Sequence, residues 1–95
     1  MKTTNITRKR ITFYGQVQGV GFRYRARHAA EITGAAGWVR NDFNGTVTME
    51  IQGTEDQIDQ VIIMIEQGRY VRIDRMDVKT IPVHKDEQGF RTERG

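Results

Sequence analysis

The chain has 95 residues and a mass of 11.0 kDa, which is the size of one small domain. Hydrophobic residues make up 37% of the sequence and charged residues 28%, a balance typical of a globular protein rather than a disordered one. The sequence contains no cysteine, which excludes disulfides, cysteine-rich zinc sites and cysteine nucleophiles.

The sequence also indicates the cellular compartment of the protein. No apolar run approaches the roughly 18–20 residues that a membrane-spanning helix needs. The polar start, residues 1–10, has no apolar core of a signal peptide. We therefore expect a cytoplasmic protein without membrane association, and a monomer is the default expectation for a chain of this size.

The net charge of +3 conceals an asymmetry between the two parts of the chain. Residues 1–41 sum to +7, whereas residues 42–95 sum to −4. A positive field of this kind suits a nucleic acid or a small anion, and a solvated basic face has the same composition. Charge alone leaves these three interpretations open.

The regular structure is predicted to begin with a strand. Apolar and polar residues alternate from residue 11 to residue 17, which is the period of a half-buried strand. Glycines at positions 15, 19 and 21 then interrupt this pattern. Residues 1–7 are predicted to form a flexible tail, and residues 8–95 a single domain.

A helix is predicted after the glycines, followed by a strand and a turn. The helix has an apolar stripe of small side chains, which lets it lie close to a sheet. The stripe consists of Phe22, Ala26, Ala29 and Ala30. Gly34 is expected to end the helix. Residues 36–41 predict a short strand, and Asn44-Gly45 predicts a tight hairpin because both residues tolerate positive φ.

The next two elements have clear local signals. Residues 46–52 alternate between apolar and polar and predict the clearest strand of the chain. Thr54 and Gln57 have the spacing of a capping box, so a second helix is expected to begin there. Its apolar stripe consists of Ile58, Val61, Ile62 and Ile65, and Gly68 is expected to end it.

The last part of the chain predicts a fourth strand from Val71 to Val78, closed by Pro82. Its alternation slips between Ile73 and Met76, which suggests a bulge. Met76 is expected to fill the core, as are Met49 and Met64. Phe90 and Thr92 share a parity that would face both side chains inward in a short final strand.

The elements therefore follow the order β-α-β-β-α-β with a short extra edge strand. This order predicts an α+β fold of the ferredoxin-like kind, an α/β sandwich with two helices on one face of an antiparallel sheet. Such a fold carries many functions, so the function has to be inferred from a site.

The first candidate site is the glycine-rich segment Gly15–Arg23. It lacks the Lys-Ser/Thr of a Walker A loop, and Tyr24 stands where a dinucleotide-binding loop has its third glycine. Glycines nevertheless allow successive N–H groups to face one point, and the following helix adds unpaired N–H groups. Arg23 would add a forked cationic donor. The segment has the properties of an anion-binding loop, with a merely tight strand-to-helix turn as the alternative.

The second candidate site is Asn41, at the end of the strand predicted over residues 36–41. Asn41 shares its strand parity with Val39 and is opposite in parity to Trp38. One interpretation is an uncharged side chain that positions a water molecule. The other is a turn-initiating asparagine whose side chain caps its own backbone.

These two segments together resemble the acylphosphatase family. The family pattern G-x-V-Q-G-V-x-F/Y-R is met by Gly15, Val17, Gln18, Gly19, Val20, Phe22 and Arg23. The second pattern is met by Gly37, Trp38, Val39, Arg40 and Asn41, and it continues at Gly45, Val47 and Gly53. The resemblance runs from about residue 10 to residue 90 and implies the same ferredoxin-like sandwich.

The resemblance implies an enzyme that hydrolyses the carboxyl-phosphate bond of small acyl phosphates, giving carboxylate and inorganic phosphate, with no metal and no other cofactor. It implies that Arg23 binds the phosphate and that Asn41 orients the attacking water. Backbone amides would hold the phosphoryl oxygens; they belong to Gln18, Gly19, Val20, Gly21 and Phe22. Inorganic phosphate or sulfate would compete with the substrate.

The chain departs from the family pattern near its end. Thr92 stands where the family has an apolar residue, and Arg94 stands where it has an aromatic one. We expect this departure to affect the stability of the last strand and not the site.

Two other functions share the predicted fold. One is a non-catalytic module that binds an anion or carbamoyl phosphate, as in hydrogenase maturation proteins, whose longer chains also carry zinc-binding cysteines. The other is RNA binding by a domain of the RRM type, which needs aromatic residues on the third strand. Residues 46–52 contain no aromatic residue, so no nucleic-acid partner is expected.

Overall fold

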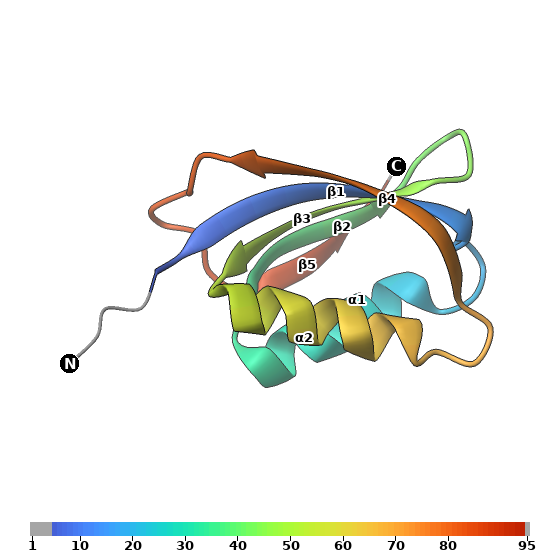
Figure 1. The fold of residues 1–95 in the computed structure, drawn as a ribbon, viewed down its shortest axis with the longest axis horizontal. Helices are drawn as coiled ribbons and strands as arrows, with labels where there is room; N and C mark the ends of the chain where they lie inside the picture. The colour runs from blue at the N-terminus through green and yellow to red at the C-terminus, as the bar shows by residue number, and fades with distance from the viewer. Residues whose placement is uncertain (1–4, 95) are drawn as a thin grey trace.

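The computed structural model describes residues 5–94, and its elements follow the predicted order (Figure 1). The strands are β1 (Thr7–Gln16), β2 (Ala36–Asn41), β3 (Val47–Gly53), β4 (Arg72–Ile81) and β5 (Phe90–Glu93). The helices are α1 (Phe22–Thr33) and α2 (Glu55–Glu66). Most of the tail predicted over residues 1–7 lies outside the described residues, and β1 begins at Thr7.

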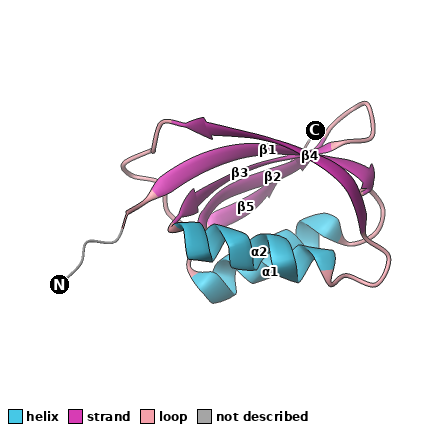
Figure 2. Cartoon of the chain, in the orientation of Figure 1, coloured by secondary structure: helices cyan, strands magenta, loops and turns pink. Residues whose placement is uncertain are grey.

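The predicted ferredoxin-like α+β architecture is confirmed. The strands lie in the order β4-β1-β3-β2-β5, and both helices cover one face of this sheet (Figure 2). The three pairings among β4, β1, β3 and β2 are antiparallel, whereas β5 runs parallel to β2, so the sheet is mixed. In the described part of the chain, no helix is long and apolar enough to cross a membrane.

The sheet pairings place three chain segments at one end of the molecule. Strands β1 and β2 are both antiparallel to β3, so they run in the same direction, and β5 runs parallel to β2. The carboxyl ends of β1, β2 and β5 therefore meet at the same end of the sheet. The loop into α1, the β2–β3 hairpin and the last described residues all begin there.

The first helix has the ends and the buried face that its sequence predicts. Its stripe is buried as expected, at Phe22, Ala26, Ala29 and Ala30. Gly34 takes a left-handed conformation, and its N–H donates to the carbonyl of Ala30 at 2.8 Å. The first residue of the helix, Phe22, packs edge to face on Phe13 with 4.8 Å between ring centroids. This contact fixes the start of the helix on the sheet.

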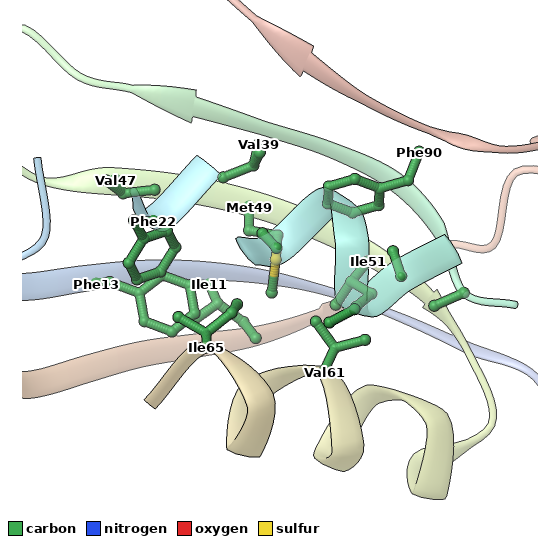
Figure 3. Close-up of a cluster of buried hydrophobic side chains, with 14 of the residues drawn as sticks. Ile11, Phe13, Phe22, Val39, Val47, Met49, Ile51, Val61, Ile65 and Phe90 are labelled. Carbon is green, nitrogen blue, oxygen red and sulfur yellow. The ribbon is translucent and has the colours of Figure 1, made fainter. Parts of the chain in front are cut away.

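The second helix opens with the predicted capping box. The Thr54 hydroxyl accepts from the Gln57 N–H at 3.1 Å, and the Gln57 side chain accepts from the Thr54 N–H at 2.8 Å. Ile58, Val61 and Ile65 are fully buried against the sheet. All three belong to one continuous core. Figure 3 shows Val61 and Ile65 in this core, beside side chains from α1 and from the inner faces of β1, β2 and β3.

The edge strand β4 contradicts one expectation about the core. The predicted bulge is confirmed, because the pairing with β1 shifts at Gly15, opposite Ile73. Met76 was expected in the core, however, and it is 38% exposed, as Val78 is 47% exposed. The reason is topological: β4 lies at the edge of the sheet, and the helices cover the central strands. Met49, on a central strand, is fully buried as predicted.

The hairpin between β2 and β3 exists, but its predicted backbone is wrong at one residue. Gly45 has a positive φ of 94°, whereas Asn44 keeps a negative φ. The turn is wider than two residues, since the Gly45 N–H donates to the carbonyl of Asp42 at 3.2 Å. The Asn44 side chain instead accepts from the N–H of Thr46 at 3.1 Å. This local bond holds Asn44 in an ordinary conformation.

A buried ion-pair network on the open face of the sheet was not foreseen. Arg8 is fully buried, and its guanidinium contacts Glu50 at 2.8 Å, Glu87 at 3.0 Å and Gln52 at 3.2 Å. Glu87 belongs to the connection between β4 and β5, so this arginine ties that connection to the sheet. Its partners are more than forty positions away in sequence, so hydrophobic periodicity and short motifs cannot predict these contacts.

This network predicts a dependence of stability on pH. Burial would raise the pKa of Glu87, but hydrogen bonds and charge from Arg8 and Arg91 outweigh burial and lower that pKa below its ordinary value of 4.5. The ionised carboxylate therefore stabilises the fold fully above pH 4.5, and this contribution is lost as the pH falls through the lower pKa of the folded state. We expect Glu87→Gln to be less stable than the wild type at neutral pH and to lose less stability on acidification.

Urea unfolding from neutral pH down to about pH 3 measures this difference. Glu66→Gln, which removes an exposed carboxylate at the end of α2, serves as the matched control and should follow the wild-type curve. If the stability of Glu87→Gln and of the wild type depended on pH in the same way, Glu87 would not be a source of the pH dependence.

Candidate active site

The structure brings the two predicted site side chains to one place. Arg23 lies in the first turn of α1, and Asn41 is the last residue of β2. Both line a small cavity of about 200 Å³ at the end of the sheet where β1 and β2 finish. The other residues that line it are Val17, Gly19, Gly21, Phe22 and Tyr24. The glycine loop, the arginine and the asparagine therefore form one site.

The glycine loop is held at both ends by buried side chains. Val17 is 1% exposed and Phe22 is 2% exposed, so the backbone between them is anchored in the core. Gly19 and Gly21 have φ values of 73° and 82°. A Cβ added at either glycine would meet open space, so glycine is needed there for the left-handed backbone and not for packing.

The backbone N–H groups of this loop have no hydrogen-bond partner in the described part of the chain. Within residues 5–94, no backbone N–H of residues 18–24 donates a hydrogen bond, and the first bond of the helix runs from the Arg25 N–H to the Gly21 carbonyl at 3.0 Å. Gly21 occupies the N-cap position, where it has no side chain to cap the helix. A row of unpaired N–H groups at the positive end of a helix is suited to bind an anion.

Arg23 is the cation nearest to this row of amides along the chain. Its side chain is half-buried, and it makes no ion pair or hydrogen bond with another of the described residues. Other arginines of the same helix behave differently: Arg27 pairs with Glu31, and Arg25 donates to the carbonyl of Met64. The guanidinium of Arg23 is thus available to a ligand in the cavity.

Asn41 is also without a partner on its side chain among residues 5–94. Its position opposite Val47 puts it on the helix-facing side of the sheet, as its parity predicts. The alternative of a turn-capping asparagine is wrong, because Asp42 and Asn44 make the side-chain bonds of this turn. The carboxamide of Asn41 is therefore available to the cavity that it lines.

Gln18 has a role that the sequence analysis missed. Only its backbone was expected to matter, but its side-chain amide donates to the carbonyls of Asp42 at 2.7 Å and Thr46 at 2.9 Å. These two bonds tie the glycine loop to the hairpin that follows Asn41. Gln18 therefore fixes the distance between the amides of the loop and the asparagine.

The carboxylate of Asp42 stabilises the same hairpin. It accepts from the hydroxyls of Thr46 at 2.9 Å and Thr48 at 2.6 Å, and from Arg40 at 3.2 Å. Burial would raise the pKa of Asp42, but these hydrogen bonds lower it below its ordinary value of 3.8. Asp42 is ionised and fully engaged at neutral pH, so its role is to hold the turn next to Asn41.

If the chain hydrolyses acyl phosphates, as its motifs predict, Gln18→Met should lower the kcat of that reaction by about ten- to a hundredfold. The reason is that nothing would then hold the loop at a fixed distance from Asn41. The affinity for inorganic phosphate should change much less, since the loop amides remain. Turnover and phosphate titrations of the same protein measure both effects. Gln16→Met, a change of the same chemistry at an exposed position, is the control. An unchanged kcat in Gln18→Met would rule out this positioning role.

The last strand contributes to the site, contrary to the sequence analysis. Thr92, Glu93 and Arg94 line a second cavity of about 560 Å³ together with Arg23 and Asn41. The physical reason is the parallel pairing of β5 with β2, which brings the end of β5 beside the end of β2. Thr92 and Arg94, the two residues that depart from the family pattern, therefore line a cavity next to Arg23 and Asn41, so their effect is not limited to the stability of the last strand.

The open face of the sheet has a cavity of its own, of about 300 Å³. It is lined by Arg10, Thr12, Arg40, Thr48, Asp77 and Lys79. Its charges are largely satisfied within the protein, because Arg10 pairs with Glu50 and Arg40 with Asp42. It also has no glycine loop to supply unpaired amides, so the end of the sheet is the better candidate site.

The fold and the site together define a small α+β domain in which an arginine, a carboxamide and glycines of a loop line one cavity, an arrangement suited to an anion. The sequence profile of the Acylphosphatase family matches residues 9–92. An acylphosphatase from Geobacillus kaustophilus is 40% identical over 85 residues, which cover 88% of this chain and 90% of the relative. The chain belongs to the acylphosphatase family, a family of hydrolases that act on acyl phosphates, as its motifs predict.

Solved structures agree with this assignment. An acylphosphatase from Coxiella burnetii superposes with a TM-score of 0.84 and 30% identity, over 98% of this chain and 100% of the other. Full-length HypF in its phosphate- and nucleotide-bound form also superposes, with a TM-score of 0.84 and 28% identity, but the match covers 97% of this chain and only 12% of HypF. The comparison with whole acylphosphatases favours the enzyme over the non-catalytic module.

Proposed function

We propose that this chain hydrolyses acyl phosphates without a metal, with the phosphoryl group held by the amides of residues 18–22 and by Arg23. Asn41 orients the attacking water. The observation that carries the proposal is that Arg23 and Asn41 line one cavity together with Gly19, Gly21 and Phe22 of the loop. Among residues 5–94, neither the backbone N–H groups of residues 18–22 nor the side chains of Arg23 and Asn41 have a hydrogen-bond partner.

The chemistry of the substrate explains why so few side chains suffice. The leaving group is a carboxylate, whose conjugate acid has a pKa of about 4–5 by analogy with side-chain carboxyls. Such a group departs without a proton, so no general acid is required. Phosphoryl transfer is loose, with little bond formation to the nucleophile, so a strong base contributes little. Positioning and charge stabilisation remain to be supplied.

The site residues match these two needs. The negative charge of the transferring group spreads over the phosphoryl oxygens, and the amides of Gly19 to Phe22 with the fork of Arg23 are donors for these oxygens. Because the cavity is built on buried anchors, its donors are already oriented before the substrate arrives. This preorganisation is the source of the rate enhancement that we propose.

The water molecule is placed by Asn41 in our proposal. Its oxygen forms a bond to phosphorus, the bond from phosphorus to the acyl oxygen breaks, and the electron pair of that bond leaves with the carboxylate. The proton that the water loses passes to a phosphoryl oxygen, which is itself basic. No protein carboxylate is needed as a base, in keeping with Asp42 being engaged by Thr46 and Thr48.

We also propose the setting in which the enzyme acts. Its partner is a small acyl phosphate, and inorganic phosphate or sulfate competes for the same loop. We propose a cytoplasmic monomer that binds neither nucleic acid nor membrane.

Hydrolysis of benzoyl phosphate by the pure protein in excess EDTA tests the proposal. We expect rapid turnover that EDTA does not reduce and that inorganic phosphate inhibits competitively. A folded protein that binds phosphate but does not turn over benzoyl phosphate would overturn the proposal and support a binding module instead.

A further inference from the structure

The site has two adjoining cavities, and their linings differ. The small cavity contains the glycine loop, whereas the larger one contains Thr92, Glu93 and Arg94; Arg23 and Asn41 line both. If the phosphoryl group occupies the loop, as in the proposed function on which this inference rests, the acyl group extends past Arg23 into the larger cavity. The larger cavity is then the acyl subsite.

The larger cavity has a polar and charged lining. None of the five residues that line it is apolar, so it offers little to a hydrophobic acyl group. Thr92 is responsible for part of this character, because it takes the helix-facing position opposite Val39 where an apolar side chain would have extended the core. An acyl group with polar or charged substituents fits this lining better.

The charge that remains in this cavity is positive. Arg94 is exposed and has no ion-pair or hydrogen-bond partner among the described residues. The acid next to it, Glu93, is paired with Arg91, which also contacts Glu87. With Arg23 engaged by the phosphoryl group, Arg94 is the cation of the cavity that has no counterion among residues 5–94.

We propose that Arg94 forms a subsite for a second anionic group on the acyl part of the substrate. The enzyme then prefers acyl phosphates that carry a further carboxylate or phosphate over those with an uncharged acyl group. Since Arg94 is solvent-exposed, its interaction with that anion is screened, and a preference of about two- to fivefold is expected.

A matched pair of substrates tests this subsite. Benzoyl phosphate and 4-carboxybenzoyl phosphate differ by one carboxylate, and the ratio of their kcat/KM values measures the preference. We expect the wild type to favour 4-carboxybenzoyl phosphate by about two- to fivefold and Arg94→Gln to bring this ratio close to one. Arg94→Lys should retain part of the preference, and added salt should reduce it.

Two controls make the test decisive. Lys85→Gln changes the net charge equally but lies in the connection between β4 and β5, away from the residues of the cavity, so it should keep the wild-type ratio. Phenylphosphonate and 4-carboxyphenylphosphonate give the same comparison by calorimetric binding, without turnover. A wild-type ratio of one, or a ratio that survives in Arg94→Gln, would overturn the subsite. Failure to hydrolyse either phosphate would count against the proposed function, and the phosphonates would still decide on Arg94.

Discussion

Replacing Arg23 with alanine should reduce kcat/KM for benzoyl phosphate by about a thousandfold or more and abolish measurable phosphate binding. The expected size is that of removing an arginine from a phosphoryl-transfer site. The guanidinium is the main positive charge next to the loop, and the amides alone carry only partial charges. Steady-state kinetics and phosphate titration of the same preparation measure both losses.

The loss should not come from misfolding. Arg23 has no partner among the described residues, so its removal leaves no buried group unpaired. A cation in the first turn also opposes the helix dipole, so the alanine variant should match or slightly exceed the wild type in Tm. Arg23→Lys keeps the charge but not the fork, and we expect it to recover part of the binding. An active, phosphate-binding alanine variant would refute the role of Arg23.

Replacing Asn41 with alanine should separate turnover from binding. We expect kcat to fall by about 10²–10³, the effect of losing one preorganised donor, whereas the affinity for phosphate stays nearly unchanged. The reason is that, in the proposed mechanism, the phosphoryl oxygens contact the loop and Arg23, while Asn41 contacts the water. Phosphate inhibition constants beside kcat values measure this separation.

Asn41→Asp gives a sharper comparison, because it keeps the shape of the side chain and adds a negative charge to the cavity. We expect this variant to lose both turnover and phosphate affinity, through repulsion of the anion. If Asn41→Ala instead weakened phosphate binding and left kcat intact, Asn41 would be a phosphate ligand and not a water-positioning residue.

Local patterns predicted the parts of this fold that depend on neighbours in sequence. The apolar stripe of α1 and the capping box of Thr54 and Gln57 each involve residues that are close in sequence. Their spacing along the chain therefore predicts them directly. The glycine loop and Asn41 were likewise recognisable, since each lies at the boundary of a well-marked element. Their meeting in one cavity follows from β1 and β2 running in the same direction.

Long-range contacts explain what the sequence did not predict. The burial of Arg8 depends on Glu50, Gln52 and Glu87, which the fold brings together from distant positions. The exposure of Met76 depends on its strand being at the sheet edge, which alternation does not report. Arg94 lies beside Arg23 and Asn41 because β5 pairs in parallel with β2. The sequence offered one indication of this position, since residues 90, 92 and 94 share the same strand parity.

A titration of the protein with inorganic phosphate, followed by backbone amide NMR, measures the location of the phosphate site directly. If the proposed site is correct, the largest shifts belong to the amides of residues 18–24, with the side-chain signals of Arg23 and Asn41 moving in the same concentration range. Shifts centred instead on Arg10, Arg40 and Lys79 would place the anion on the open face of the sheet and contradict the proposed site.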